Sequence, residues 1–289
     1  MYPKALFYIF GQGVYAYGLC MAVGIIACFA FLMFTMKIKK FNEASSDAVI
    51  LIGIFGTGFG LLSAMLFQGM YHYIATGEFT TAKMTFIGGL IGGVTSFLGV
   101  WNIYMFVIRP RTNIKWLKPE MNATLTDALP FIPIGITIAH AFGRLGCFFA
   151  GCCHGKEVEW GITCAGNSYM KVIPIQLFEM SFLILLSVIM AVLYFKFKFN
   201  YNFALYPIAY GIWRFIIEYF RGDDRDKFVG DLSPSQFWSI FMVIIGVGFI
   251  FAQYYFFSKL MKHPEEKTVE AVQESTADGG ESADNGENS

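Results

Sequence analysis

Long apolar stretches separated by short polar connections dominate this sequence. Each stretch runs for roughly 20 residues, the length that a helix needs to cross a hydrocarbon core about 30 Å thick. Seven of them lie at about residues 13–35, 48–70, 86–108, 128–150, 174–195, 202–220 and 235–258. The pattern predicts an all-α integral membrane protein with seven transmembrane helices.

Two further segments differ from these helices in polarity. Residues 151–173 are moderately polar and are predicted to form a small cap outside the membrane. Residues 259–289 are acidic and hold no aromatic side chain, so they cannot bury enough apolar surface to fold. We expect a transmembrane domain over residues 1–258 and a disordered tail after it. Because the first apolar stretch is long enough to span and has no basic n-region before it, we expect it to be retained rather than cleaved as a signal peptide.

Composition supports a membrane protein and excludes one class of partner. Of the 289 residues, 56% are apolar and 15% are charged, which is too apolar for a soluble domain of this length. The formal net charge is zero, so the chain has no basic excess with which to bind nucleic acid.

The positions of Lys and Arg predict the orientation, because cytoplasmic connections carry the excess of these residues. One side of the predicted bundle holds twelve of them: Lys37, Lys39, Lys40, Arg109, Arg111, Lys115, Lys118, Lys196, Lys198, Lys259, Lys262 and Lys267. The opposite side holds seven: Lys4, Lys83, Lys156, Lys171, Arg221, Arg225 and Lys227. We therefore expect the N-terminus and the cap outside and the C-terminus in the cytoplasm. The connection after the sixth stretch fits least well, because it places three cations outside.

The fourth apolar stretch contains a charged residue, Arg144. A cation in hydrocarbon costs about 3 kcal/mol on insertion scales, so water, a partner or an anionic ligand must offset it. His140 lies four residues earlier and therefore on the same helical face. Gly143 and Gly146 leave room for a backbone or a lipid headgroup to approach closely. This combination predicts a functional site.

Polar residues also interrupt the fifth and sixth stretches. Gln176 and Glu179 lie three residues apart near the start of the fifth, where Glu179 either reaches the membrane interface or pairs inside the bundle. The sixth carries Tyr210, Arg214 and Glu218 at successive i, i+4 positions, which form one polar stripe. An Arg214–Glu218 pair that only locks helices together is one interpretation. An anionic headgroup held by both membrane arginines is the other, and it also accounts for Arg144.

Glycines and an aromatic residue mark three of the remaining stretches. The third stretch begins with a run of four glycines, Gly88, Gly89, Gly92 and Gly93. The run indicates either a tight helix crossing, which we favour, or a helix break that offers backbone N–H groups to an anion. In the second stretch Gly56 and Gly60 form a GxxxG pattern, which favours close packing on a neighbour. Tyr17 opens the first stretch, where an aromatic belt at the interface is the simplest interpretation.

Four of the six cysteines cluster in and after the fourth stretch, at Cys147, Cys152, Cys153 and Cys164, with His154 among them. Their spacing is not a familiar zinc pattern, so a disulfide or plain packing of small side chains is favoured over a metal site. The sequence predicts no metal and no cofactor.

Several motifs occur in an order that resembles the bacterial prolipoprotein diacylglyceryl transferase family. They are Tyr17-Gly18, the glycine run from Gly88, Gly143-Arg144-Leu-Gly146, Pro174-x-Gln176-Leu-Phe-Glu179, Tyr210-Gly-x-x-Arg214-Phe-Ile-Ile-Glu218-x-Phe-Arg221 and a Ser-x-x-Gln236 turn. The resemblance covers about residues 13–258. It implies a multi-pass protein of the bacterial inner membrane with seven spans and an outer N-terminus. It also implies transfer of a diacylglyceryl group from phosphatidylglycerol to the lipobox cysteine of prolipoproteins, a step of lipoprotein biosynthesis.

The resemblance also implies roles for individual residues. The catalytic set it implies is Arg144, Arg214 and Tyr210. The family usually has a histidine at the position of Ile87, and His140 or His154 could substitute for it by residue type; we include His140 in the catalytic set. The substrate-binding set is Gly88, Gly89, Gly92, Gly143, Gly146, Gln176, Glu179, Glu218 and Tyr17. In the family, the signature that follows the arginine at the position of Arg144 usually reads Asn-Phe-x-Asn-Gly-Glu. In this sequence Cys147 and Cys152 replace the first and last residues of that signature. Ile173 likewise replaces a histidine. The general base therefore stays unassigned.

Two functions follow from these observations. The first is the lipid transferase, because ordered charged motifs inside a membrane are functional by default. The alternative is a diverged membrane protein that binds or transports lipid, or one that uses its cysteines as a thiol or metal site.

Overall fold

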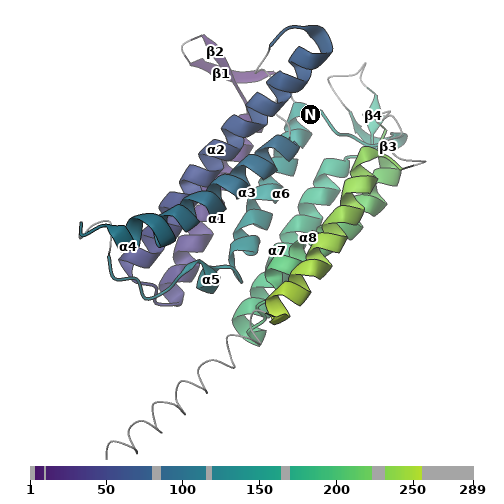
Figure 1. The fold of residues 1–289 in the computed structure, drawn as a ribbon. Helices are drawn as coiled ribbons and strands as arrows, with labels where there is room; N and C mark the ends of the chain where they lie inside the picture. Colours follow the sequence, from purple (N-terminus) through teal and green to yellow (C-terminus); the bar gives the residue numbers. More distant parts are fainter. Residues whose placement is uncertain are drawn as a thin grey trace, which may run out of the picture. The chain divides into compact units, whose positions relative to one another are not determined.

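The chain folds into two compact units, each described here by itself. One unit comprises Phe7–Gly146, and the other comprises Cys147–Ser289 together with Met1–Leu6. The computed structural model describes residues 4–9, 11–79, 86–114, 119–163, 170–222 and 232–255 (Figure 1). The boundary between the units falls within one helix, α6, between Gly146 and Cys147.

The N-terminal unit opens with a hairpin and a long helix. Strands β1 (Ala5–Ile9) and β2 (Gln12–Tyr15) pair as a two-stranded sheet, with Gly11 between them at φ +78°. Helix α1 (Ala16–Ile38) follows directly. A second helix, α2 (Glu43–Thr76), begins at Asn42, whose side chain accepts a hydrogen bond from the Ser45 N–H at 2.9 Å. This cap satisfies one of the unpaired donors of the first turn.

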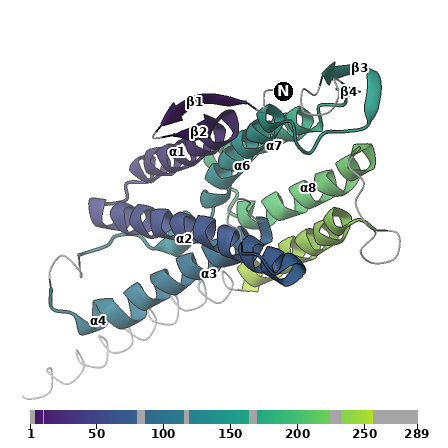
Figure 2. The ribbon, with the colours of Figure 1, turned by 90° about the horizontal axis from the view of Figure 1, so that it is seen from above.

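Helices α2 and α3 (Phe86–Asn102) pack face to face through their glycines, and both views show them side by side (Figure 2). A Cβ added at Gly60 would lie 3.1 Å from the Gly89 carbonyl oxygen, and one added at Gly88 would lie 2.6 Å from Phe67 Cβ. Ser63 Oγ donates to the Gly88 carbonyl at 2.8 Å. The backbones therefore approach as closely as glycine allows, which is the tight crossing that the sequence favoured.

Beyond Asn102 the helical backbone continues with different hydrogen bonding. A π-helical segment, η1 (Ile103–Ile108), leads into the short α4 (Arg109–Arg111). The short helix α5 (Leu125–Ala128) then begins with a capping box formed by Thr124 and Asp127. Helix α6 (Ile132–Ala150) starts after a turn that contains Pro130, and Pro133 lies in its first turn, where a missing N–H costs no helical hydrogen bond.

Helix α6 packs against α1 within the N-terminal unit. A Cβ at Gly24 would lie 3.0 Å from the Ala139 carbonyl oxygen, and one at Gly135 would lie 3.0 Å from Cys28 Sγ. A Cβ at Gly146 would lie 3.1 Å from the ring of Tyr17. The two helices therefore run antiparallel, with the start of α1 beside the end of α6.

The C-terminal unit is built on three helices, α7 (Ile175–Phe197), α8 (Asn202–Ile217) and the helix Pro234–Tyr255. Phe182 of α7 stacks on Trp213 of α8 with ring centroids 4.5 Å apart. A Cβ at Gly211 of α8 would lie 2.9 Å from the Ser239 carbonyl oxygen of the third helix. A 3₁₀ turn, η2 (Glu218–Phe220), extends α8.

A small β region joins α6 to α7. Strands β3 (Glu157–Thr163) and β4 (Lys171–Val172) pair antiparallel. Just before β3, Gly155 donates to the Ile173 carbonyl at 2.9 Å on one side and forms an isolated bridge with Arg221 on the other. The segment after α6 is therefore held between the start of α7 and the end of α8.

Five helices are long and apolar enough to cross a membrane: Ala16–Ile38, Glu43–Ile74, Ile132–Ala150, Ile175–Phe197 and Pro234–Tyr255. The mostly helical membrane architecture that the sequence predicted is therefore confirmed, with two small β-hairpins that the prediction of an all-α chain missed. The other two predicted spans contain shorter α-helices, because η1 follows α3 and because α8 has only 16 residues before its 3₁₀ turn. The predicted tail lies outside the described residues.

Candidate functional site

The polar stripe on α8 meets a buried carboxylate on α7. Glu179 has no exposed surface, and its Oε1 accepts from the Tyr210 hydroxyl at 3.4 Å. The same oxygen lies 3.5 Å from Nη1 of Arg214. Glu179 is therefore paired inside the helix bundle and does not reach the membrane interface, which answers one question that the sequence left open.

Arg214 connects three helical segments of the C-terminal unit. Its Nη2 lies 2.7 Å from Oε2 of Glu218 and donates to Ser235 Oγ at 2.9 Å. The predicted Arg214–Glu218 pair is present, but it is part of a larger network rather than an isolated helix lock. A guanidinium suits this position because its planar fork of donors serves several acceptors at once.

The helix Pro234–Tyr255 begins with a capping box that also contacts the network. The Gln236 N–H donates to Ser233 Oγ at 3.2 Å, and the Ser233 N–H donates to Gln236 Oε1 at 3.1 Å. Pro234 occupies the first helical position, where its missing N–H costs nothing. Ser233 Oγ also donates to Glu218 Oε1 at 3.0 Å, so the cap fixes this carboxylate. The Ser-x-x-Gln236 turn gave a signal for this cap in the sequence.

Arg221 is a member of this network to which the sequence analysis gave no site role, although it counted Arg221 among the outer cations and placed it at the end of a family motif. It is 6% exposed, and its Nε lies 3.7 Å from Glu218 Oε2. Its position three residues after Glu218 was the available signal, since residues at this spacing are neighbours on a helix. The network therefore balances two buried carboxylates with two buried guanidiniums.

Gln176 lies on α7, the helix that carries Glu179, and it connects this helix to the segment that follows α6. Its Nε2 donates to the Cys152 carbonyl at 2.5 Å. Its Oε1 is buried and accepts no hydrogen bond from any residue that the structure describes. A buried amide oxygen without a donor is costly, so a polar group brought by a ligand or water would be stabilised there.

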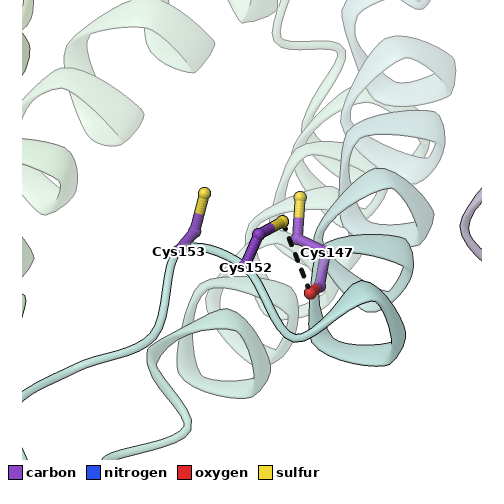
Figure 3. A group of neighbouring side chains, drawn as sticks. All are labelled: Cys147, Cys152 and Cys153. Carbon is purple, nitrogen blue, oxygen red and sulfur yellow. Dashed lines mark hydrogen bonds between the residues drawn. The ribbon is translucent and has the colours of Figure 1, made fainter. Parts of the chain in front are cut away.

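The end of α6 gathers three cysteines into one cluster (Figure 3). The Gly151 N–H donates to the Phe148 carbonyl and the Cys152 N–H to the Cys147 carbonyl, both at 3.2 Å, while Gly151 adopts φ +70°. These bonds define a Schellman motif, which brings the side chains at its two ends into contact. Here those side chains are Cys147 and Cys152, and the Sγ atoms of both lie within 4.8 Å of Cys153 Sγ and of each other.

The cluster favours a thiolate at Cys153. Hydrogen bonds from the Cys147 and Cys152 thiols lower the pKa of Cys153 well below its usual range, and Arg221 adds a hydrogen bond and a favourable charge, against a rise caused by burial. For Cys152, a hydrogen bond with Cys147 lowers the pKa, but a hydrogen bond with Cys153, burial and the charge on Cys153 raise it on balance. None of the three forms a disulfide in this structure, and Cys164 lies outside the described residues.

The other predicted site residues lie in the N-terminal unit. His140 and Arg144 are half-buried on consecutive turns of α6, and both have interaction partners. Gly146 packs against Tyr17 of α1, whereas a Cβ at Gly143 would meet no atom within 4 Å. The glycines at 88, 89 and 92 face α2 at close range. Of the predicted set, the structure therefore brings Gln176, Glu179, Tyr210, Arg214 and Glu218 into one unit, and the rest into the other.

Comparison with known proteins adds an independent finding. The sequence profile of the prolipoprotein diacylglyceryl transferase family matches residues 4–252. A phosphatidylglycerol–prolipoprotein diacylglyceryl transferase of Clostridium tetani is 30% identical over 258 residues, which cover 85% of this chain and 95% of the relative. A second transferase of Clostridium perfringens is 30% identical, over 83% of this chain and 91% of the relative. One from Finegoldia magna is 29% identical, over 84% and 93% respectively.

Proposed function

Because this chain belongs to the prolipoprotein diacylglyceryl transferase family, we propose that it transfers a diacylglyceryl group from phosphatidylglycerol to prolipoproteins. The observation that carries the proposal is the family match over residues 4–252, within which the buried Glu179–Arg214–Glu218 network lies. The comparisons favour this reaction over the alternative of a diverged protein without transferase activity. The acceptor atom in the proposed reaction is the thiol of the lipobox cysteine.

The chemistry of the leaving group explains why arginines suit this reaction. When the glyceryl C–O bond of phosphatidylglycerol breaks, the phosphodiester becomes the monoester of glycerol phosphate and its negative charge grows. Guanidinium groups stabilise such charge through permanent charge and paired donors. In the proposal, Arg214 supplies this stabilisation, and Glu179 and Glu218 hold its side chain in place.

Most of the other residues that we propose for the reaction belong to the N-terminal unit. Arg144 is the second proposed phosphate ligand, and His140 is the proposed acid–base residue one turn away. The glycines at 88, 89, 92, 143 and 146 and Tyr17 are proposed to contact the lipid substrate, as are Gln176 and Glu179 on the other unit. The observation supporting this assignment is the occurrence of all of these residues except His140 in the motifs shared with the family, while His140 is proposed from its residue type and its position one turn before Arg144.

The proposed topology follows from the seven apolar stretches and the cation asymmetry. We place the protein in the bacterial cytoplasmic membrane with seven spans, an outer N-terminus and a cytoplasmic tail over 259–289. The β3–β4 region would then form part of an outer cap. The five helices long enough to span support the membrane assignment. In the proposal, the helical segments 86–111 and 202–220 are the remaining two spans.

Complementation of a bacterium depleted of its own transferase tests the function. We expect the chain to restore growth and to restore labelling of a lipoprotein with a radioactive acyl chain. A variant of a prolipoprotein whose lipobox cysteine is changed to serine serves as the control and should stay unlabelled. Absence of labelling by a membrane-inserted, folded protein would contradict the proposal.

A further inference from the structure

The geometry of the cysteine cluster suggests a use for all three thiols at once. Their Sγ atoms lie within 4.8 Å of one another. In a tetrahedral zinc site with Zn–S bonds near 2.3 Å, neighbouring sulfurs are about 3.8 Å apart. Small changes of side-chain torsion would therefore bring the three sulfurs onto the face of one coordination tetrahedron.

Two local features favour a ligand site over simple packing of small side chains. Cys153 adopts φ +60°, a left-handed conformation that residues other than Gly, Asn and Asp seldom take, and such strain gathers at functional positions. Its thiol also contacts the buried Arg221 rather than apolar groups alone. A packing cysteine would need neither feature.

A disulfide accounts for the cluster less completely. One disulfide joins only two of the three sulfurs, and a Cys147–Cys152 disulfide would leave Cys153 beside Arg221 without a role. A soft metal ion engages all three, since thiolate is the ligand that Zn²⁺ and other soft ions prefer. Three thiolates and one Zn²⁺ carry a net negative charge, which the adjacent guanidinium of Arg221 offsets.

The described residues offer three ligands rather than four. No other His, Cys, Asp or Glu of the described chain joins the group, and His154 directs its Nδ1 at the Gly155 carbonyl, 3.1 Å away. Structural zinc sites have four protein ligands, whereas reactive ones keep one position open. We infer that Cys147, Cys152 and Cys153 bind a soft divalent metal ion, of which Zn²⁺ is the first choice, with a fourth position open to an incoming thiol.

The open position has a natural occupant, provided that the proposed transferase function holds. The acceptor thiol would bind there and lose its proton to solvent, because a coordinating thiol is deprotonated. Its sulfur electron pair then attacks the glyceryl carbon, the C–S bond forms, and the C–O bond breaks with its pair leaving on glycerol phosphate. No electron is gained or lost overall. The metal would thus activate the acceptor thiol, and this step would not need the proposed acid–base role of His140.

The site lies next to the proposed phosphate network within the C-terminal unit. Arg221 contacts both Cys153 and Glu218, and Glu218 contacts Arg214. Gln176 binds the Cys152 carbonyl from the helix that carries Glu179. The cluster is therefore connected to Arg214 through two buried side chains, Arg221 and Glu218.

Metal binding is tested first and without any activity measurement. Protein purified in detergent without chelator should contain roughly one Zn²⁺ per chain, as a single thiolate site requires. Replacement by Co²⁺ should produce thiolate-to-cobalt charge-transfer absorption. Cys147→Ser and Cys153→Ser should lose both signals, whereas the matched control Cys28→Ser on α1 should keep them. Substoichiometric metal in folded wild-type protein, or a Cys147–Cys152 disulfide in a free-thiol count, would overturn the site.

The open position is tested on the Co²⁺ form. An acceptor peptide with a lipobox cysteine should shift the absorption, and the same peptide with serine should not. Loss of stoichiometric binding in Cys164→Ser would show a closed site with four protein ligands and would overturn the open position. Full transfer by metal-free protein would overturn the role of the metal in activating the acceptor thiol, while leaving the transferase function intact. Stoichiometric metal without transfer would instead contradict the transferase function alone.

Discussion

Glu179 is a fully buried carboxylate in the first turns of a helix whose neighbouring side chains are mostly apolar. Burying a charge is costly unless partners compensate, and here Tyr210 and Arg214 share one of its oxygens. Those two contacts are 3.4 Å and 3.5 Å long, while the Arg214–Glu218 contact is 2.7 Å. The carboxylate therefore orients the Arg214 fork rather than neutralising it alone.

We predict that Glu179→Gln lowers transfer at least about tenfold, equivalent to about 1.4 kcal/mol of transition-state stabilisation. The amide keeps the shape and one acceptor but loses the charge that positions Arg214. Because Glu218 still pairs with Arg214, the stability loss should be smaller than the 3–5 kcal/mol of a broken buried pair, as an order of magnitude. Labelling assays and thermal unfolding in detergent measure the two effects. The control is Glu157→Gln on exposed β3, and equal activity of both variants would contradict the prediction.

Arg214→Lys tests whether the guanidinium fork matters beyond its charge. Lysine keeps the positive charge but cannot contact Glu179, Glu218 and Ser235 from one planar group. We expect the rate of transfer to fall at least about tenfold, which corresponds to about 1.36 kcal/mol of activation free energy. The rate should fall further in Arg214→Gln. Arg111→Lys on α4 is the control and should keep full activity. Wild-type turnover by folded Arg214→Gln would reduce Arg214 to a structural partner of Glu218.

At the residue scale the sequence predicted contacts within one helix better than contacts between segments. The i, i+4 stripe of Tyr210, Arg214 and Glu218 follows from helical periodicity and appears in the structure as a network. The Arg221–Cys153 contact joins residues 68 positions apart, through a turn whose geometry depends on Gly151 and a strained Cys153. Periodicity carries no information about such a contact.

At the scale of whole elements, the helices were predictable where apolar length alone determines them. The long α1, α2 and α7 match the apolar stretches closely, since a span needs only length and apolar composition. The switch to π-helix at Ile103 and the 3₁₀ end of α8 were not predictable, because the hydrophobic pattern does not distinguish one hydrogen-bonding pattern from another. The β-hairpins were missed because each of their strands is only two to seven residues long.

The packing of α8 on the helix Pro234–Tyr255 gives a test at this scale. A Cβ at Gly246 would lie 2.5 Å from Ile208 Cγ1 and 3.0 Å from the Ala204 carbonyl oxygen, so Gly246→Ala must push the helices apart. We expect a loss of roughly 1–3 kcal/mol, as overpacking typically costs. At Gly248 an added Cβ meets no atom within 4 Å, and Gly248→Ala should be neutral or stabilising by up to about 1 kcal/mol. Equal unfolding temperatures of the two variants in detergent would contradict the packing.

At the scale of the whole molecule, the orientation stays a prediction, and the burial of Arg221 changes the cation count on which it rests. Arg221 was counted among seven outer cations, but it is buried and paired with Glu218 rather than free in a connection. Its charge is thus neutralised inside the protein, and the count of cations in outer connections falls to six, against twelve on the other side. Without Arg221, the connection after the sixth stretch carries two of these cations, Arg225 and Lys227, instead of three.

We therefore predict that the acidic tail faces the cytoplasm and that the β3–β4 region faces outward. A cysteine introduced as Glu159→Cys on exposed β3 should react with a membrane-impermeant maleimide in intact cells. A cysteine introduced as Ser282→Cys in the tail should react only after the cells are permeabilised. The parent chain without an introduced cysteine gives the background from its native thiols, and denatured samples confirm that both sites are reactive. Labelling of Ser282→Cys in intact cells would reverse the orientation, and it would place the cysteine cluster and the arginine network at the wrong face to meet an exported prolipoprotein.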